Sequence, residues 1–501
     1  MSVSAILTFV SIAFTIPVLL ISYFYVVEFL GALRYPRKLE TNNVKLEHFP
    51  AVSILIATFN EKFVISRTID ALKALDYPRE LIQVVIADDS TDETRSIIDK
   101  KCEELIRFGF DVVISRRATR TNFKSGALNQ AASRLYGSYV LLLDADSIVP
   151  PEVIKKGVEA FARYPNISFV SYRVGHYNRE HNLTTRLYAL FLDLGDTLGK
   201  MGAFPMNLPF SLQGGFALIS RSALESVGRW SNDTIVEDAD LSCKLYESGR
   251  KGVYLSNVCI LSEDPISLAI WKRQSARVAQ GWAKCISKHF KQIVTTPSLP
   301  IWKRIVLLLT LLSPFASLSW ITVNFIAALS LVLGLTSSGA SVFSSFGYVL
   351  LVGVPGVVML SAGIFTLHVQ RLLTRRNLLL IPLLSYVGLF MLTTNSVGFL
   401  NGLLGQTGFF FRTPKNGHHL QDHTHGYSVA PPLDRNSLVE VVLSISALIL
   451  SVFVLELGVW LLSLFGFAIL TAKSMNLLQI SKERTPEKEI TEPILTQSIS
   501  L

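Results

Sequence analysis

The chain has 501 residues, of which 50% are hydrophobic and 17% are charged, with a mean hydropathy of +0.41. A soluble enzyme carries nearer a quarter charged residues, so this composition excludes a disordered chain and a typical soluble protein and indicates a membrane protein. The formal net charge of +9 predicts basic segments beside a membrane. No basic patch with interleaved aromatics occurs, so we expect no nucleic acid among the partners. The four cysteines form no C-x-x-C pair, and neither a zinc site nor a disulfide scaffold is predicted.

An apolar stretch opens the chain. Residues 1–33 contain one acid, Glu28, and exceed the ~20 residues that cross a bilayer, so we expect a transmembrane helix here. No Lys or Arg precedes it. A basic cluster follows at once: Arg34, Arg37 and Lys38. By the positive-inside rule the N-terminus should lie outside and the following chain should begin in the cytoplasm.

Short β-branched runs alternate with helical patterns across residues 40–265, which we expect to form a cytoplasmic α/β domain. The expected strands are 51–57, 83–87, 112–115 and 139–143, and helical patterns between them include 62–75 and 91–108. This alternation predicts right-handed βαβ units and a parallel sheet. Ligands of such sheets bind beyond the carboxyl ends of the strands, so the residues just after each strand are the candidate site. Amphipathic interfacial helices are expected next, over residues 266–300.

The C-terminal membrane region is expected over residues 301–475. Its apolar segments are 303–335, 347–370, 378–402, 437–457 and 458–475. Basic residues after the second and the last of these place both ends in the cytoplasm. The loop 403–436 and a disordered tail, 476–501, should then be cytoplasmic too. Segment 378–402, which has a polar insert and cytoplasmic flanks, is expected to be re-entrant or interfacial. Together with the N-terminal helix, this gives five crossings plus the segment 378–402. The alternative is six full crossings, with loop 403–436 outside.

Acidic side chains follow several of the expected strands. Asp144 and Asp146 come directly after one strand, and if the extended geometry persists both carboxylates point to the same side. A Mg²⁺ or Mn²⁺ ion held by them would keep positions open for diphosphate oxygens. The alternative for this D-x-D is a turn with a helix cap. Asp88-Asp89 is open to the same alternative.

Two later motifs lie on expected helices. Glu237, Asp238 and Asp240 open an amphipathic stretch. Their carboxylates either complement the helix dipole or place Asp238 as a general base toward an acceptor hydroxyl. Gln274 and Arg277 share one helical face, and amide and guanidinium groups on that face suit a diphosphate. A membrane-surface helix is the alternative, and both can hold together.

In this order, the motifs resemble those of membrane-integrated family 2 glycosyltransferases, the cellulose synthase, hyaluronan synthase and glucomannan synthase-like enzymes. The motifs are ATFNE (57–61), DDS (88–90), KSGALN (124–129), DAD (144–146), QGGF (213–216), VEDADL (236–241), QSARV (274–278) and FFRTPKNG (410–417). The resemblance covers roughly residues 50 to 420. It implies a GT-A domain inserted between transmembrane α-helices, a nucleotide-sugar donor, inversion at the anomeric carbon, and hexosyltransferase activity in polysaccharide biosynthesis.

Position by position, the resemblance also implies roles for single residues. Asp238 would be the catalytic base, and Asp144 with Asp146 would hold Mg²⁺ or Mn²⁺. The implied nucleotide-sugar contacts are Thr58, Glu61, Asp89, Lys124, Asp144, Gln274, Arg277, Arg412, Thr413 and Lys415. The implied acceptor contacts are Gln213, Glu237 and Trp282.

Two positions depart from the family pattern. Val236 replaces a threonine, and Val278 replaces the tryptophan on which a growing glycan rests in the family. Trp282, one helical turn on, is the expected substitute. The replacement at position 278 concerns acceptor binding more than donor chemistry.

Two acceptors are therefore compatible with the sequence. The first is a growing β-glycan that receives glucose or mannose from a UDP- or GDP-hexose at the membrane. The second is a membrane lipid, such as a diacylglycerol or a polyprenyl phosphate, glycosylated once. A transporter or receptor with a nucleotide-sensing domain is disfavoured, because the apolar segments contain almost no ionisable residues. The expected location is the cell membrane, multi-pass, with membrane lipids as further partners.

Overall fold

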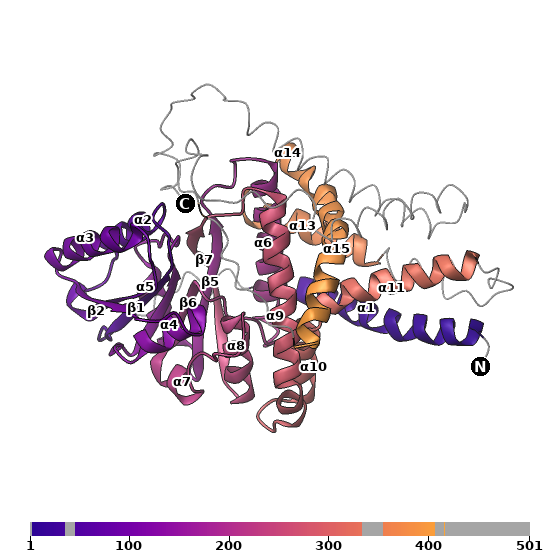
Figure 1. Cartoon of the computed structure of the whole chain (residues 1–501), viewed down its shortest axis with the longest axis horizontal. Helices are drawn as coiled ribbons and strands as arrows, with labels where there is room; N and C mark the ends of the chain where they lie inside the picture. Colours follow the sequence, from indigo (N-terminus) through magenta and orange to yellow (C-terminus); the bar gives the residue numbers. More distant parts are fainter. Residues whose placement is uncertain (1–2, 36–45, 333–353, 406–414, 416–501) are drawn as a thin grey trace.

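The computed structural model describes residues 3–35, 46–332, 354–405 and 415. A sheet covered by helices forms one side of the molecule, and long helices extend from it on the other (Figure 1). The strands are β1 (Val52–Thr58), β2 (Ile82–Asp88), β3 (Asp111–Arg116), β4 (Tyr139–Asp144), β5 (Ile167–His176), β6 (Phe216–Ser220) and β7 (Lys251–Ser262).

Helices connect these strands and follow the last of them. Those before β7 are α1 (Val3–Leu33), α2 (Ile65–Ala71), α3 (Thr94–Arg107), α4 (Phe123–Ala132), α5 (Val153–Arg163), α6 (Leu183–Asp196), α7 (Arg221–Ser226) and α8 (Glu237–Glu247). Those after it are α9 (Leu268–Thr295), α10 (Ile301–Leu311), α11 (Ser313–Val332), α13 (Val354–Val369), α14 (Arg375–Leu378) and α15 (Leu380–Leu403). The short turns η2 (Leu72–Ala74) and η3 (Arg79–Leu81) are 3₁₀ helices, and η4 (Thr197–Gly202) is a π-helix.

The sheet has the strand order β3-β2-β1-β4-β6-β5-β7 and is mixed. β1 pairs in parallel with β2 and β4, and β2 pairs in parallel with β3, which confirms the predicted βαβ units. The expectation of a wholly parallel sheet is wrong at β6, which runs antiparallel to β4 and β5. A strand's direction depends on where its connection re-enters the sheet, and the excursion through α6 and η4 brings the chain back at the carboxyl end of β4. Local hydrophobic periodicity does not indicate in which direction a strand runs through the sheet.

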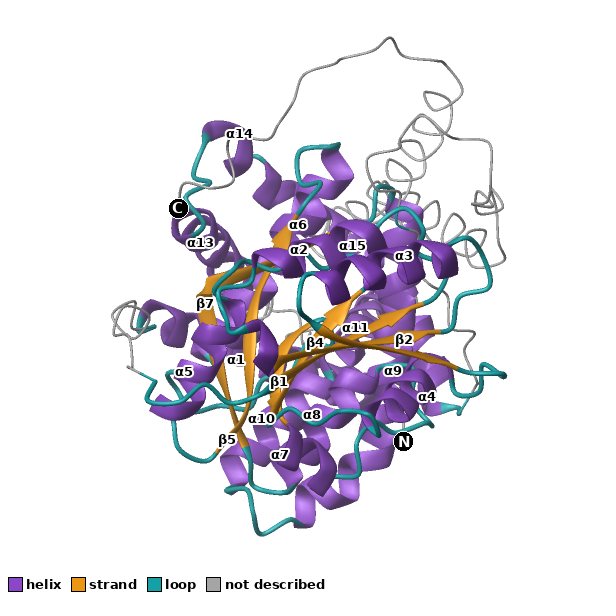
Figure 2. Cartoon of the chain, turned by 90° about the vertical axis from the view of Figure 1, so that its left-hand side faces the viewer, coloured by secondary structure: helices purple, strands orange, loops and turns teal. Residues whose placement is uncertain are grey.

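Apolar side chains alternate between the two faces of the sheet. Ile54 and Ile56 of β1 pack into a core with α2, α3 and α5, whereas Leu55 packs into a second core with α4, α8 and α9. Successive strand residues point to opposite faces, so a strand buried on both faces is apolar throughout. Figure 2 shows α2 and α3 on one side of the sheet and α4, α7 and α8 on the other. The result is a three-layer α/β/α arrangement.

The sequence-predicted elements in this layer are confirmed. Each of the four predicted strands is present, with both ends within one residue of the prediction. The helical pattern at 91–108 is α3, and that at 62–75 is α2 with η2. The motif at 236–241 opens α8, and the amphipathic stretch after β7 is one long helix, α9.

One helix of the described ranges, Ala5–Leu33 within α1, is long and apolar enough to cross a membrane by itself. The predicted continuous segment at 303–335 is instead divided, because α10 and α11 meet at a 64° bend next to Leu312. The two reach spanning length only together. In Figure 1, α1 and α11 extend side by side to the right. The predicted segments 437–457 and 458–475, and the tail 476–501, lie outside the described residues.

The segment predicted to be re-entrant or interfacial, 378–402, forms α14 and α15, and α15 packs along α9. The helices α9 and α15 run up the middle of Figure 1, across the direction of α1 and α11. The polar insert faces the protein, since Thr393, Thr394 and Ser396 are buried and Ser275 of α9 donates to Asn395 at 2.7 Å. Protein packing therefore accounts for the polar insert.

Because β1 is buried on both faces of the sheet, shortening one of its side chains should destabilise the protein. We expect Ile56→Ala, at a position with no exposed surface, to lower the free energy of unfolding by about 2–5 kcal/mol, because it leaves a cavity between β1 and the overlying helices. Thermal or denaturant unfolding in detergent measures the change. The control is Ile106→Ala on α3, where the side chain is 55% exposed and the expected change is within about 0.5 kcal/mol. Equal effects at both positions would contradict the assignment of this core.

Candidate active site

The strand register gathers the candidate residues at one edge of the sheet. Thr58 is paired with Asp88 across β1 and β2, and Ala57 is paired with Asp144 across β1 and β4. β5 and β7 end at the same edge with His176 paired to Ser262. Because β6 is antiparallel, it begins at this edge of the sheet. The residues that precede β6, 213–215, therefore lie in the site, whereas the residues that follow β6 lie at the opposite edge. A search confined to the residues after each strand would miss this segment.

Asp89 lies next to two arginines from the segment after β3, Arg117 and Arg120. Arg117 Nε donates to Asp89 Oδ1 at 2.8 Å, and a second guanidinium nitrogen reaches the other oxygen. The Arg120 guanidinium lies 3.5 Å from the centroid of the Phe59 ring. The buried hydroxyl of Thr58 has no hydrogen-bond partner within the described part of the chain, which leaves it available to a ligand.

Lys124 joins two of the predicted carboxylates. Its ammonium lies 2.7 Å from Asp144 Oδ1 and 2.9 Å from Glu237 Oε1. Burial would lower the pKa of Lys124, but the two carboxylates outweigh it and raise that pKa, so the side chain stays charged. Gly215 lies against Asp144, and a Cβ there would be 2.5 Å from Oδ2. Only glycine fits at this position, which brings the segment before β6 onto the carboxylate.

Asp238 occupies the first turn of α8, directly after Glu237. The backbone N–H of Gly214 donates to Asp238 Oδ2 at 3.2 Å, and its neighbour Ala239 donates to Oδ1 at 2.8 Å. Burial, then the adjacent Glu237 carboxylate, raises the pKa of Asp238. Glu237 itself has a lowered pKa, because Lys124 outweighs the effect of burial. Two neighbouring carboxylates thus differ in basicity, with the more basic one beside Gly214.

Asp146 is oriented differently from the sequence expectation. β4 ends at Asp144, and Ala145 and Asp146 form a turn, so the premise of persistent extended geometry is wrong. Asp146 Oδ2 accepts from Ser262 Oγ at 2.6 Å and from the backbone N–H of Glu263 at 2.8 Å. A turn was the alternative for this motif, and here it carries a buried, hydrogen-bonded carboxylate.

Lys415 reaches this carboxylate from the far end of the sequence. Its ammonium lies 2.8 Å from Asp146 Oδ2 and also contacts the carbonyl oxygen of Glu263. Burial would raise the pKa of Asp146, but Lys415, Ser262 and Glu263 outweigh it and lower that pKa to about 2. The Glu61 carboxylate also acts on the Lys415 charge. The predicted contacts Arg412 and Thr413 lie outside the described residues.

The two aspartates fit a hard divalent ion in part. No set of three His, Cys, Asp or Glu side chains within the described ranges lies together as a complete ligand sphere. However, Asp144 Oδ2 and Asp146 Oδ1 have no hydrogen-bond partner among the described residues, so each aspartate keeps one hard oxygen donor. Mg²⁺ commonly takes one or two protein carboxylates and completes its sphere with water and phosphate oxygens. The donor set matches that pattern.

Further predicted contacts lie on α9 and in the segment before β6. On α9, Gln274 accepts a hydrogen bond from Tyr188 at 3.1 Å, and Arg277 lies close enough to Glu237 to lower its pKa. Gln213 accepts from Lys200 of η4, immediately before the Gly214 that binds Asp238. Trp282 lines an apolar pocket between α8, α9 and α10 with Phe210 and Leu311. The described surroundings of Trp282 are therefore apolar, and its role as an acceptor contact stays a prediction.

Sequence reasoning missed Arg117 and Arg120. The only local signal is the run R-R-A-T-R at 116–120, directly after a predicted strand. Loop arginines there pair with Asp89 or stack on Phe59 only because the fold brings three strand ends together.

Known proteins are similar to a large part of this chain. Residues 139–400 match the family model described as glycosyl transferase family group 2. Glucomannan 4-beta-mannosyltransferase 2 of Arabidopsis thaliana is 28% identical over 262 residues, covering 52% of this chain and 49% of that protein. Glucomannan 4-beta-mannosyltransferase 1 of Oryza sativa subsp. japonica is 30% identical over 261 residues, with 51% and 50% covered. The chain thus spans about half the length of the relatives that it matches.

A solved structure has a similar fold. The mannosyltransferase PcManGT from Pyrobaculum calidifontis, in complex with GDP-Man and Mn²⁺, superposes with a TM-score of 0.52 at 18% identity. The superposition covers 80% of this chain and all of that one. It identifies the mixed α/β layer as a GT-A-like fold. Because the family model spans more than half of the sequence, the chain belongs to glycosyl transferase family group 2.

Proposed function

We propose that this chain is an inverting glycosyltransferase that moves a hexose from a nucleoside diphosphate sugar to a hydroxyl of a growing β-glycan at the membrane. The observation that carries the proposal is the placement of Asp238, a carboxylate of raised pKa, beside Glu237, which Lys124 joins to Asp144. A base and a charge-compensated carboxylate pair at one sheet edge are what transfer from a sugar diphosphate requires.

The reaction follows from this placement. Asp238 takes the proton of the acceptor hydroxyl while the acceptor oxygen forms its bond to the anomeric carbon. The bond from that carbon to the diphosphate oxygen breaks on the opposite face, and its electron pair leaves with the diphosphate, so the configuration inverts. Lys124, Arg277 and Lys415 offset the charge that develops on the diphosphate. The hydrogen bond from Gly214 orients Asp238 for the proton transfer.

Asp144 and Asp146 are the residues that would hold a divalent cation, Mg²⁺ or Mn²⁺. Such an ion would act as a Lewis acid on the departing diphosphate. The presence of Mn²⁺ in the complex of the mannosyltransferase PcManGT supports this assignment. Thr58, Glu61 and Asp89 then contact the nucleotide end of the donor.

The donor is a UDP- or GDP-hexose, and mannose or glucose is the sugar. Mannosyltransferase names among the relatives, and GDP-Man in the complex of PcManGT, make GDP-mannose the first donor to test. For the acceptor, Gln213 beside Gly214 supports a glycan hydroxyl near Asp238. A membrane lipid is the second candidate acceptor, because Val278 stands where a glycan-supporting tryptophan is expected.

We place the catalytic domain, residues 40–265, in the cytoplasm and the N-terminus outside, with α1 in the membrane. The packing of α15 along α9 supports an interfacial position for the segment 378–402. The loop 403–436 would then be cytoplasmic, and the contact of Lys415 with Asp146 supports placing it on the same side as the catalytic domain.

A donor panel tests the proposed function directly. We expect the purified protein in liposomes to release nucleoside diphosphate from one of radiolabelled GDP-mannose, GDP-glucose or UDP-glucose and to form a labelled product. A ladder or polymer on sizing supports the β-glycan acceptor, and a single chloroform-soluble product supports the lipid acceptor. Absence of turnover with every hexose donor of both nucleotides would contradict the proposal.

Replacement of the proposed base should abolish transfer but leave donor binding intact. We expect Asp238→Asn to lower kcat by roughly 10²–10⁴-fold, since the amide cannot take the acceptor proton. Residual turnover should also lose the acid limb of the pH profile, where wild-type activity falls as the pH falls through the raised pKa of Asp238. The control is Asp76→Asn, at a side chain that is 63% exposed. Wild-type kcat in Asp238→Asn would remove this residue as the base.

Removal of divalent ions should stop turnover reversibly. We expect EDTA to abolish product formation and added Mg²⁺ or Mn²⁺ to restore it, because Asp144 and Asp146 provide hard oxygen donors. Asp146→Asn should raise the Mn²⁺ concentration at half-maximal rate, while the remote Asp76→Asn leaves it unchanged. Full activity in EDTA would show that cationic side chains alone compensate the diphosphate.

A further inference from the structure

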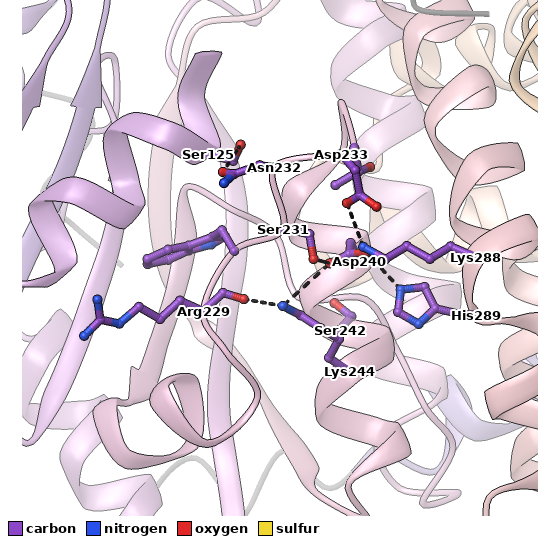
Figure 3. A network of polar contacts seen from close by, with 12 residues as sticks. Ser125, Arg229, Ser231, Asn232, Asp233, Asp240, Ser242, Lys244, Lys288 and His289 are labelled. Atoms are coloured by element: carbon purple, nitrogen blue, oxygen red, sulfur yellow. Dashed lines mark hydrogen bonds and ion pairs between the residues drawn. The ribbon is translucent and has the colours of Figure 1, made fainter. Parts of the chain in front are cut away.

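An ionic cluster with a buried centre joins α8, the helix of the proposed base, to α9 (Figure 3). At its centre is Asp240, which is fully buried two residues after Asp238 on α8. Asp240 accepts from Ser231 Oγ at 2.6 Å, and its other oxygen lies 2.8 Å from Lys288 Nζ and 2.9 Å from His289 Nε2. Both cations come from α9, so the cluster joins two helices.

The His289 ring bridges two carboxylates of α8. Its second nitrogen, Nδ1, lies 2.8 Å from Glu247 Oε1. Ionised carboxylates only accept hydrogen bonds, so both ring nitrogens must donate and the ring is an imidazolium. Burial would lower the pKa of His289, but Asp240 and Glu247 outweigh it and raise that pKa to about 9. The ring is therefore charged at neutral pH.

The cluster is electrically balanced only with His289 protonated. Its carboxylates are Asp233, Asp240 and Glu247, and its cations are Lys244, Lys288 and His289. Lys288 binds Asp233 at 2.7 Å, and Lys244 lies 3.8 Å from Asp240 and donates to the Arg229 carbonyl. Loss of one cation would leave a buried carboxylate uncompensated, which is strongly unfavourable.

The contacts of the cluster fix α8 lengthwise on α9. Asp240 and Glu247 are seven residues apart, about 10 Å along the helix axis. Before α8, Val236 packs on Gly281, where a Cβ would lie 2.4 Å from Cγ1 of Val236. At the last residue of α8, the Glu247 carbonyl accepts a hydrogen bond at 3.1 Å from Oγ1 of Thr296, which directly follows α9. The same continuous helix α9 also carries Gln274 and Arg277, the proposed diphosphate contacts. The contacts between α8 and α9 therefore set the distance between Asp238 and these two residues.

We propose that His289, together with Lys288, is a positioning residue for Asp238. Through the ion pairs of these two residues with Asp240 and Glu247, it keeps Asp238 at a fixed distance from the face of α9 that carries Gln274 and Arg277. The inference rests on the proposed function, in which Asp238 is the base. His289 contacts neither donor nor acceptor and acts through α8.

The test compares His289→Gln, which is neutral, with His289→Lys, which keeps the charge. The assay measures kcat and KM with the donor that turns over in the panel above, on full-length protein in liposomes. We expect His289→Gln to lower kcat by about 10- to 100-fold, because a small displacement of the base is costly, with KM for the donor within about 2-fold. The matched control is Lys155→Gln, which removes an exposed ion pair to Asp76 and should change neither constant.

The pH profile separates positioning from general destabilisation. The contribution of the imidazolium is complete below the ordinary histidine pKa and is lost as the pH rises through about 9. Wild-type kcat should therefore fall above about pH 9. His289→Gln should lack this limb, and His289→Lys should regain part of kcat and keep it at higher pH.

Hydrogen exchange gives a readout that needs no turnover. Amides of residues 236–247 should exchange about 10-fold faster in His289→Gln than in the wild type. Folded His289→Gln with wild-type kcat, alkaline limb and exchange would overturn the proposal. If that variant does not fold, Ser231→Ala and Lys288→Gln each remove one bond to Asp240, and unchanged kcat in both would overturn it equally. Absence of turnover in the wild type would instead count against the proposed function. The hydrogen-exchange measurement would still test whether His289 stabilises α8.

Discussion

The constraint on which this structure depends is the compensation of negative charge at one edge of the sheet. Asp144, Asp146, Glu237 and Asp238 all lie there, and carboxylates this close cannot all remain ionised unless cations balance them. Lys124 balances two of them from α4, and Lys415 balances Asp146 from a segment 269 positions away. Among the residues that the structure describes, Asp238 forms no ion pair, and its pKa is raised rather than lowered. This uneven distribution of cations distinguishes Asp238, the proposed base, from the neighbouring carboxylates.

In the proposed function, compensation from several elements also explains how the site receives a sugar diphosphate. A donor brings two phosphate charges, and the lysines that now hold Asp144, Glu237 and Asp146 are available to interact with those charges at little distance. A divalent ion bound by the aspartates would add to the same balance. In the proposed donor complex, Lys124 and Lys415 would thus exchange part of their contact with the carboxylates for contact with the diphosphate.

The helix α9 connects this site with the rest of the molecule. One face carries Gln274 and Arg277, a second packs on α15 through Ser275 and Asn395, and its later turns bind α8 through Lys288 and His289. Displacement of α9 would therefore move the proposed base, the proposed diphosphate contacts and α15 together. This coupling gives the interface between the sheet layer and the long helices a direct bearing on the chemistry.

The sequence by itself determined the family, the βαβ half of the sheet and most of the candidate site residues. Short apolar strands such as β1 are recognisable because burial on both faces leaves only apolar residues, and D-A-D and V-E-D are local motifs. Tertiary structure alone decided the antiparallel direction of β6, the turn at Asp146, the bend between α10 and α11, and the partners Arg117, Lys288 and His289. These features depend on where distant segments return and which charges meet there, and neither periodicity nor spacing encodes a contact between residues far apart in the chain.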